Sequence, residues 1–178
     1  MNKILKTYCL IILLLITSIC SAQKSDKELK EEKIALVLDV VDNVVKDFNK
    51  RNEFIKRFNF DSSQQKLNLI KFDSVKMLTI KIQKNNNEGL SILKNRFKND
   101  NKEEIYNTGI KYLESIKKTE IVLLVLFDKM YKLIMGEEFG GEEIEKVNIS
   151  LKNFETAKAI YKNEIKEYAG KNDIILKL

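Results

Sequence analysis

Residues 34–58 read IALVLDVVDNVVKDFNKRNEFIKRF, and this stretch decides the fold. Its apolar side chains recur in alternating steps of three and four residues, which is the heptad spacing of one helical face. The row comprises Ile34, Val37, Val41, Val44, Phe48, Arg51, Ile55 and Phe58. Only Arg51 interrupts its apolar character. The spacing predicts a long helix over about 27–58, with Asp26 as its N-cap.

The same spacing returns near the C-terminus. The row there comprises Ile144, Val147, Leu151, Phe154, Lys158, Tyr161, Ile165 and Tyr168. Glutamates at its start suit the positive end of a helix dipole, and Gly170 suits a C′ position just after the last turn. We therefore expect a second helix over about 142–169.

A third segment, 102–135, also has helical spacing, and Asn101 is a suitable N-cap. It contains the uninterrupted apolar run Ile121–Phe127, whose β-branched members are compatible with a buried strand. Because the run lies inside a longer helical pattern, we favour a helix whose C-terminal half is covered on several sides. The run is too short for a bilayer, which needs about 20 apolar residues.

The segment 64–98 is the most ambiguous. Within it, residues 66–84 fit either a helix or a β-hairpin that turns at Asp73 and Ser74. An isolated hairpin is marginal in water, and the neighbouring segments are helical, so we favour a helix. The cluster from Asn85 to Gly89 marks the place where that helix could be interrupted.

Four long helical segments with short polar connections predict an all-α fold, namely an elongated antiparallel up-down-up-down four-helix bundle. The expected helices are 27–58, 64–98, 102–135 and 142–169. The heptad spacing predicts coiled-coil packing with nearly aligned axes. The chain has no proline, so nothing forces an early end to any helix.

The N-terminus has the layout of a secretory signal peptide over 1–22, in front of a single helical domain over 23–178. Lys3 and Lys6 precede an apolar core, and small and polar residues follow it. Cleavage after Ala22 would leave Gln23 as the first residue. An uncleaved membrane anchor and lipidation at Cys20 are the alternatives, but a bulky Ile19 precedes Cys20 where lipoprotein signals have a small residue.

Composition argues against most familiar catalytic centres. The chain has no histidine, and its only cysteines are Cys9 and Cys20, both within the expected signal peptide. A mature chain from Gln23 would have no disulfide, thiol nucleophile, imidazole or thiolate zinc site. We therefore expect no enzyme, cofactor or metal centre. An enzyme that works with carboxylates or lysines remains the less favoured alternative.

The charge balance does not indicate nucleic-acid binding. The chain has a net charge of +6, which becomes +4 without Lys3 and Lys6. Nearly all basic residues are lysines, whereas arginine provides most bidentate contacts to phosphates and bases. A mixed surface of this kind is typical of a soluble exported protein.

Two groups of residues are candidate sites. Carboxylates gather in one predicted loop and the helix start after it, and these weak metal candidates are Glu137, Glu138, Glu142, Glu143 and Glu145. No calcium-loop motif is present, so a solvated loop is the favoured interpretation. Arg51 and Lys158 occupy core-type positions, where either could line a pocket or fix the helix register. We expect both to extend their charged ends into water.

The sequence thus favours an exported bundle with a non-catalytic binding or structural role, in the cell envelope or outside the cell. Its partner would be an unknown protein or envelope component. The alternative is a periplasmic chaperone or adaptor that uses an exposed apolar groove.

Overall fold

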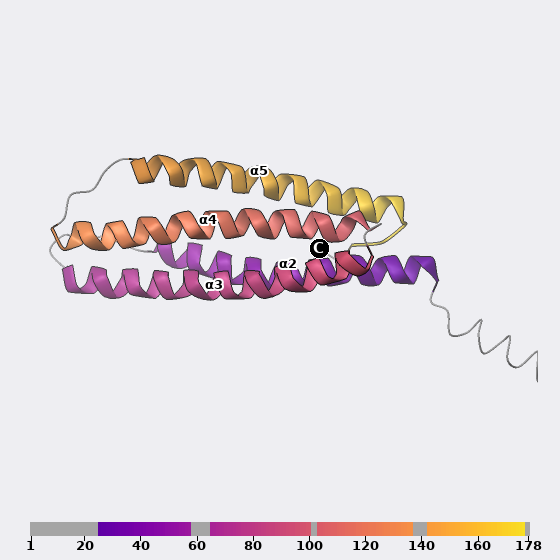
Figure 1. The fold of residues 1–178 in the computed structure, drawn as a ribbon, viewed down its shortest axis with the longest axis horizontal. Coiled ribbons are helices and arrows are strands. Elements are labelled where there is room, and N and C mark those ends of the chain that lie inside the picture. The colour runs from indigo at the N-terminus through magenta and orange to yellow at the C-terminus, as the bar shows by residue number, and fades with distance from the viewer. Residues whose placement is uncertain (1–24, 58–64, 101–102, 137–141, 177–178) are drawn as a thin grey trace, which may run out of the picture.

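The computed structural model describes residues 25–57, 65–100, 103–136 and 142–176. They form four α-helices, which are α2 (Asp26–Lys56), α3 (Gln65–Asn99), α4 (Glu104–Ile134) and α5 (Glu142–Lys171). The four helices run alternately up and down along one rod, as Figure 1 shows. The predicted four-helix bundle is confirmed, with helix ends that lie within two residues of the expected ones. The predicted signal peptide lies outside the described residues.

Residues 66–84 belong to α3, so the helical alternative is correct and the hairpin is not formed. None of the described helices has the combination of length and apolarity that crossing a membrane requires.

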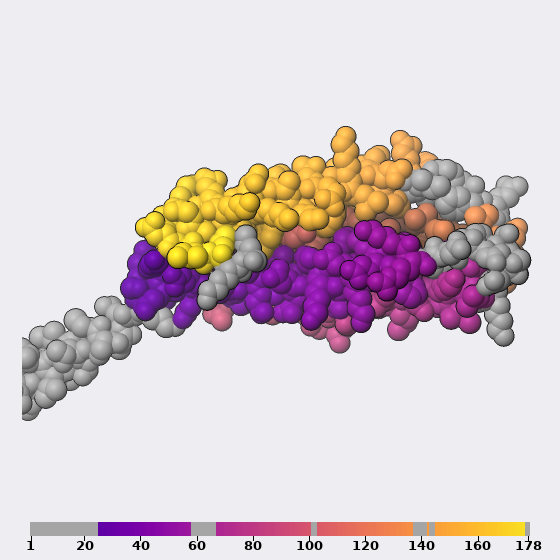
Figure 2. Space-filling view, turned by 180° about the vertical axis from the view of Figure 1, so that it is seen from behind, coloured from indigo at the N-terminus to yellow at the C-terminus, as the bar shows by residue number. Residues whose placement is uncertain are grey.

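Helix α4 is the central element. It packs closely against α3 and α5 and also contacts α2, and Figure 1 shows it between α3 and α5, with α2 behind. The view from behind shows α2 and α5 forming the opposite face (Figure 2). Accordingly, buried side chains on α4 point in several directions, including Tyr112, Leu113 and Ile116. A helix that packs against three neighbours needs an apolar face wider than a heptad seam.

The core has two parts. We call the end of the rod with Ser25 and Lys171 proximal, and the end with Lys56 and Glu142 distal. The proximal cluster is the larger and takes side chains from all four helices, including the aromatic group Phe48, Tyr112, Phe154 and Tyr161. Among the described residues, the smaller distal cluster takes its buried side chains from α3, α4 and α5, namely Phe72, Val75, Leu123, Phe127 and Val147.

The polar cluster before Gly89 does not interrupt α3. The side-chain amide of Asn85 donates a hydrogen bond to Asp47 on α2 at 2.7 Å. The amide of Asn86, which is fully buried, donates to the backbone oxygen of Leu113 on α4 at 2.8 Å. Hydrogen bonds to both neighbouring helices thus compensate for the low helix propensity of asparagine.

Two glycines let α2, α3 and α4 approach one another. A Cβ on Gly89 would lie 2.9 Å from Val40 Cγ1, and one on Gly109 would lie 2.9 Å from Val37 Cγ1 and 2.7 Å from Leu93 Cδ1. These distances are well below ordinary carbon–carbon contacts of about 3.5–4.0 Å. The missing side chains are therefore what allows the helices to pack this closely.

The helix ends differ from the predicted caps. Ser25, not Asp26, is the N-cap of α2, because its hydroxyl accepts from the Glu28 N–H at 3.2 Å while the Glu28 carboxylate accepts from the Ser25 N–H at 2.7 Å. This is a capping box. Asn101, the predicted cap of the third helix, lies outside the described residues, and the N-cap of α4 is Glu103.

At the C-terminus, Gly170 lies inside α5 and the left-handed residue is Asp173, with φ 52°. The Ile174 N–H then donates to the Ala169 oxygen at 2.9 Å, which closes a Schellman-type end. Ile174 and Leu176 pack against the proximal cluster, so the position of this turn follows from where the tail can reach the core.

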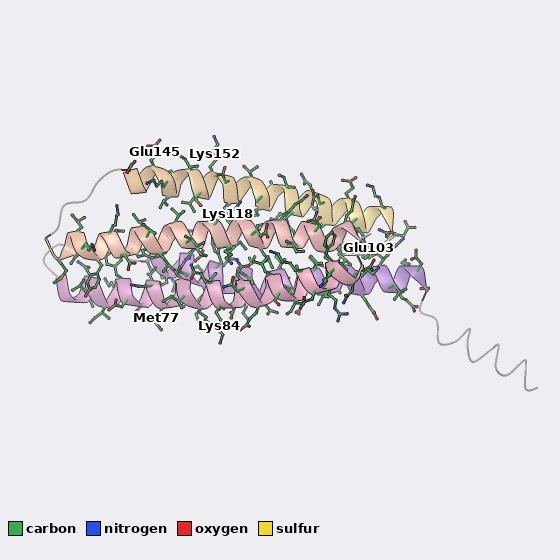
Figure 3. All side chains as sticks on the ribbon, viewed as in Figure 1. Met77, Lys84, Glu103, Lys118, Glu145 and Lys152 are labelled. Carbon is green, nitrogen blue, oxygen red and sulfur yellow. The ribbon has the colours of Figure 1, made fainter. Side chains whose placement is uncertain are left out.

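The Glu103 carboxylate fastens the proximal end. It accepts a hydrogen bond from the Tyr168 hydroxyl at 3.0 Å and lies 2.9 Å from Lys33 Nζ. Lys33 also pairs with Asp100 at 2.6 Å. These contacts join α2 and α5 to the connection between α3 and α4, and Figure 3 labels Glu103 at this end.

Burial departs from the predicted seams mainly toward the distal end. Ile55 and Leu151 are exposed although the heptad rows place them inward. The run Ile121–Phe127 is helical as predicted, and it is covered on several sides but not on all, because Ile121 and Val125 are each 49% exposed. With three neighbours on its other sides, α4 still has one face open to solvent.

We predict that Gly109→Ala destabilises the protein whereas Gly170→Ala does not. Alanine at 109 must push against the stiff, β-branched Val37, and such overpacking costs about 1–3 kcal/mol. Nothing lies within 4 Å of a Cβ at 170. Gly170→Ala should therefore change the stability only through the higher helix propensity of alanine, a stabilisation of up to about 1 kcal/mol.

Chemical denaturation of both variants measures these free energies of unfolding. Equal effects of the two substitutions would show that the close approach at Gly109 is not a packing constraint.

Candidate functional site

Arg51 lies in the core and not at the surface. Its side chain is 1% exposed, and its guanidinium forms an ion pair with Glu120 of α4. It also donates a hydrogen bond to the Thr79 hydroxyl on α3 at 3.3 Å and to Asn52 Oδ1 at 3.1 Å. The guanidinium carbon stands 4.7 Å from the centre of the Phe48 ring. The expectation that Arg51 extends into water is wrong, and the register-fixing alternative is the one its contacts favour.

Glu120 is the residue that sequence reasoning missed. It sits among the apolar core positions of α4, between Ile116 and Leu123, and it is fully buried. Burial raises the pKa of its carboxyl group to about 7, although the contact with Arg51 opposes this rise. One carboxylate inside an apolar face, matched by one arginine inside another, was a signal that the sequence already contained.

The ion pair is part of a polar layer that we define by Arg51, Thr79, Thr119 and Glu120, all of them buried. Thr119 completes it on the α5 side, where its hydroxyl oxygen accepts from the Ser150 hydroxyl at 3.2 Å. The layer joins all four helices at one level, between the proximal and distal clusters.

The polar layer can specify register, but it cannot act on a solute. Arg51 and Glu120 have almost no exposed surface, so a substrate has no access to their charges. A buried pair of this kind contributes little net stability, yet an unpaired member is costly. Its physical role is therefore to penalise any sliding of α2 along α4 that separates the two residues.

Lys158 behaves as predicted. Its side chain is 39% exposed, with the ammonium group 3.6 Å from Glu155 and above the Phe154 ring. The side chain thus covers the aromatic core while its charge stays in water.

The acidic candidates do not form a site among the described residues. Glu137 and Glu138 lie outside the described residues, as does the side chain of Glu143. Glu142 and Glu145 are exposed at the start of α5, and Glu142 lies 3.7 Å from Lys146. The part of the chain that the structure describes contains no group of three potential metal ligands.

Exposed apolar side chains are concentrated toward the distal end. We call five of them the distal surface: Ile70, Met77, Leu133, Met135 and Ile149. They extend from α3, α4 and α5, and Figure 3 shows Met77 pointing away from the bundle. Met77 is 66% exposed and Met135 is 59% exposed. Ile149 shares a helix face with Glu145 and Lys152, which point away from the bundle on the side opposite Met77 in Figure 3, so the distal surface surrounds the distal end. Exposed apolar groups concentrated toward one end are typical of an interaction region, whereas isolated ones are ordinary.

No family model, curated protein or solved structure matches the chain. Its function is therefore inferred from its own residues.

We predict that Arg51→Met lowers the free energy of unfolding by about 3–5 kcal/mol, because Glu120 is then buried without its partner. The double variant Arg51→Met/Glu120→Leu should recover most of the loss, since similar apolar volumes replace both charges. Denaturant unfolding of the two variants and the wild type measures both effects. A double variant no more stable than Arg51→Met would contradict this account of the pair.

We also predict a pH effect with a definite sign. Because the folded-state pKa of Glu120 is about 7, above the ordinary value, the folded protein binds a proton that the unfolded chain has already lost. This contribution to stability is complete below the ordinary carboxyl pKa and disappears as the pH rises through about 7. Each unit of pKa difference corresponds to about 1.4 kcal/mol.

The measurement is the unfolding free energy of wild type minus that of Glu120→Gln, which keeps the shape and removes the titration. This difference should fall between about pH 5 and pH 8. A difference that is constant or rises with pH would mean that Arg51 holds the pKa of Glu120 at or below its ordinary value.

Proposed function

We propose that the chain is an exported, non-catalytic binding protein of the cell envelope or the cell exterior, and that it contacts a protein partner through the distal surface. The observation that carries this proposal is the exposure of Ile70, Met77, Leu133, Met135 and Ile149 toward one end of the rod. At roughly 25 cal/mol per Å², covering such side chains supplies binding free energy without further chemistry.

The elongated shape of the bundle supports a role in which the rod presents its distal surface to a partner at a distance from its proximal end. The longest of the described helices, α3, has 35 residues, which corresponds to roughly 50 Å at 1.5 Å per residue. Ion pairs and hydrogen bonds fasten the proximal end, while the distal end carries the exposed apolar groups. The rod thus holds a potential contact surface well away from its N-terminus.

Export is supported by the residues that precede α2. The predicted cleavage position between Ala22 and Gln23 precedes the N-cap Ser25 by only a few residues. Cleavage there would remove Cys9 and Cys20 and leave the α2 capping box intact. The mature chain would then lack thiols and imidazoles, which supports binding over catalysis.

A chaperone or adaptor role is the second candidate, and the distal methionines favour it. Met77 and Met135 are the most exposed members of the distal surface. Methionine is flexible and polarisable, and it adapts to apolar partners of varied shape. A chaperone would use this property to hold non-native chains, whereas a dedicated binding protein would recognise one folded partner.

We predict that a photoreactive residue at position 77 forms a cross-linked adduct with a component of the native envelope or medium, and that one at position 92 does not. Ile92 is the matched control, because it is exposed on the same helix and does not belong to the distal surface. Adduct formation is read by mass after affinity purification. Equal adducts at both positions, or none at 77, would count against the proposal.

A light-scattering assay separates the two candidates. A chaperone slows the aggregation of a reduced, unfolding client, and Met77→Lys weakens that effect while Ile92→Lys does not. A binding protein with one folded partner leaves aggregation unchanged with all three proteins.

A further inference from the structure

The open face of α4 has a regular pattern that the bundle does not use for its own core. We call the following residues the α4 outer face: Glu114, Lys118, Ile121, Val125, Asp128 and Lys132. They recur in steps of four and three residues, the spacing of a second heptad seam on the same helix. Ile121 and Val125 are each 49% exposed, and the carboxylates at the two acidic positions are 44% and 58% exposed.

When two copies of this face are placed antiparallel, their residues are complementary in charge and apolar character. Ile121 and Val125 lie at the centre. In an antiparallel pair of such faces, Ile121 meets Val125 of the second helix, and Lys118 meets Asp128. One turn further out, Glu114 meets Lys132. Each position therefore faces either an apolar side chain or the opposite charge, which is how coiled coils set orientation.

We propose that two copies of this chain associate through the α4 outer face, with their α4 helices antiparallel across a two-fold axis. The two-fold axis passes between Ile121 and Val125, so every contact occurs twice, as an isologous interface requires. None of the residues involved belongs to the distal surface. The pairing is therefore independent of the proposed function and places the two distal surfaces on opposite sides of the axis.

Ion pairs within each chain position the two carboxylates of the α4 outer face. Lys94 of α3 lies 2.8 Å from Glu114, and Lys76 of α3 lies 2.6 Å from Asp128. These ion pairs hold both carboxylates beside α4. A carboxylate has about four lone-pair positions, so each retains acceptor sites for a lysine of the second copy.

The apolar centre also extends onto α3. Because α3 and α4 are antiparallel, the pair Lys76–Asp128 shows which residues of the two helices lie side by side. Ile80 on α3 and Val125 on α4 lie one turn from that pair toward the proximal end, and both are exposed. The second copy would thus cover Ile80 together with the centre of the α4 outer face.

Sedimentation velocity of the purified exported protein over a range of concentrations is the first test, and it should show a monomer–dimer equilibrium. Lys118→Asp places two carboxylates opposite each other at each end of the pair and should raise the dissociation constant about tenfold or more. Asp128→Lys should also raise the dissociation constant, because it places two lysines opposite each other at each end of the pair. The double variant Lys118→Asp/Asp128→Lys restores opposite charges and should recover the dimer. Both substituted positions are on the surface, and circular dichroism verifies that the helices are retained in all three variants.

Cysteine cross-linking is the second test, and it reads the orientation directly. A mature chain from Gln23 has no cysteine of its own. Lys118→Cys and Asp128→Cys should cross-link when the two variants are mixed, and neither should cross-link alone. A protein that stays monomeric, a dimer insensitive to the charge reversals, or Lys118→Cys that cross-links with itself would each overturn the proposal.

Discussion

The ion pair between Arg51 and Glu120 sets the register in which α2 lies beside α4. Helix packing on apolar seams alone tolerates sliding, since one valine or isoleucine resembles the next. A buried charge does not tolerate it, because separation leaves each member unpaired in a low-dielectric core. The same register brings Val37 of α2 to Gly109 of α4. The close approach at Gly109 and the buried ion pair thus depend on one alignment of α2 and α4.

The polar layer also divides the molecule. On its proximal side, four helices share a large core that includes stacked aromatic rings and a tail packed by Ile174. On its distal side, the buried cluster comes from α3, α4 and α5. Few buried apolar contacts and many exposed ones define the less stable end of a domain. Among the described residues, the smaller buried cluster therefore lies toward the same end as the apolar groups proposed to bind a partner.

The sequence predicts some features of the polar layer and the exposed apolar residues, but not their surroundings. Arg51 was visible as a charge within an apolar row, but its environment was not, because a heptad row does not identify which residue faces it across the bundle. The sequence does not single out Glu120, because the neighbouring Thr119 also lies at heptad spacing, three residues after Ile116 and four before Leu123. The exposure of Ile55 and Leu151 could not be anticipated for a related reason: the heptad rows of α2 and α5 predict both as core, and a row does not show whether another helix covers a given position.

The sequence by itself determined that the chain forms four long helices with apolar faces, because periodicity is a local property that each segment carries alone. It also determined which side chains are missing, and hence which chemistry is disfavoured. The tertiary structure decided that α4 is central, that Asn85 and Asn86 join helices where the sequence suggested a break, and that Arg51 meets Glu120. These features depend on contacts between residues far apart in the chain, and such contacts exist only once the helices have packed.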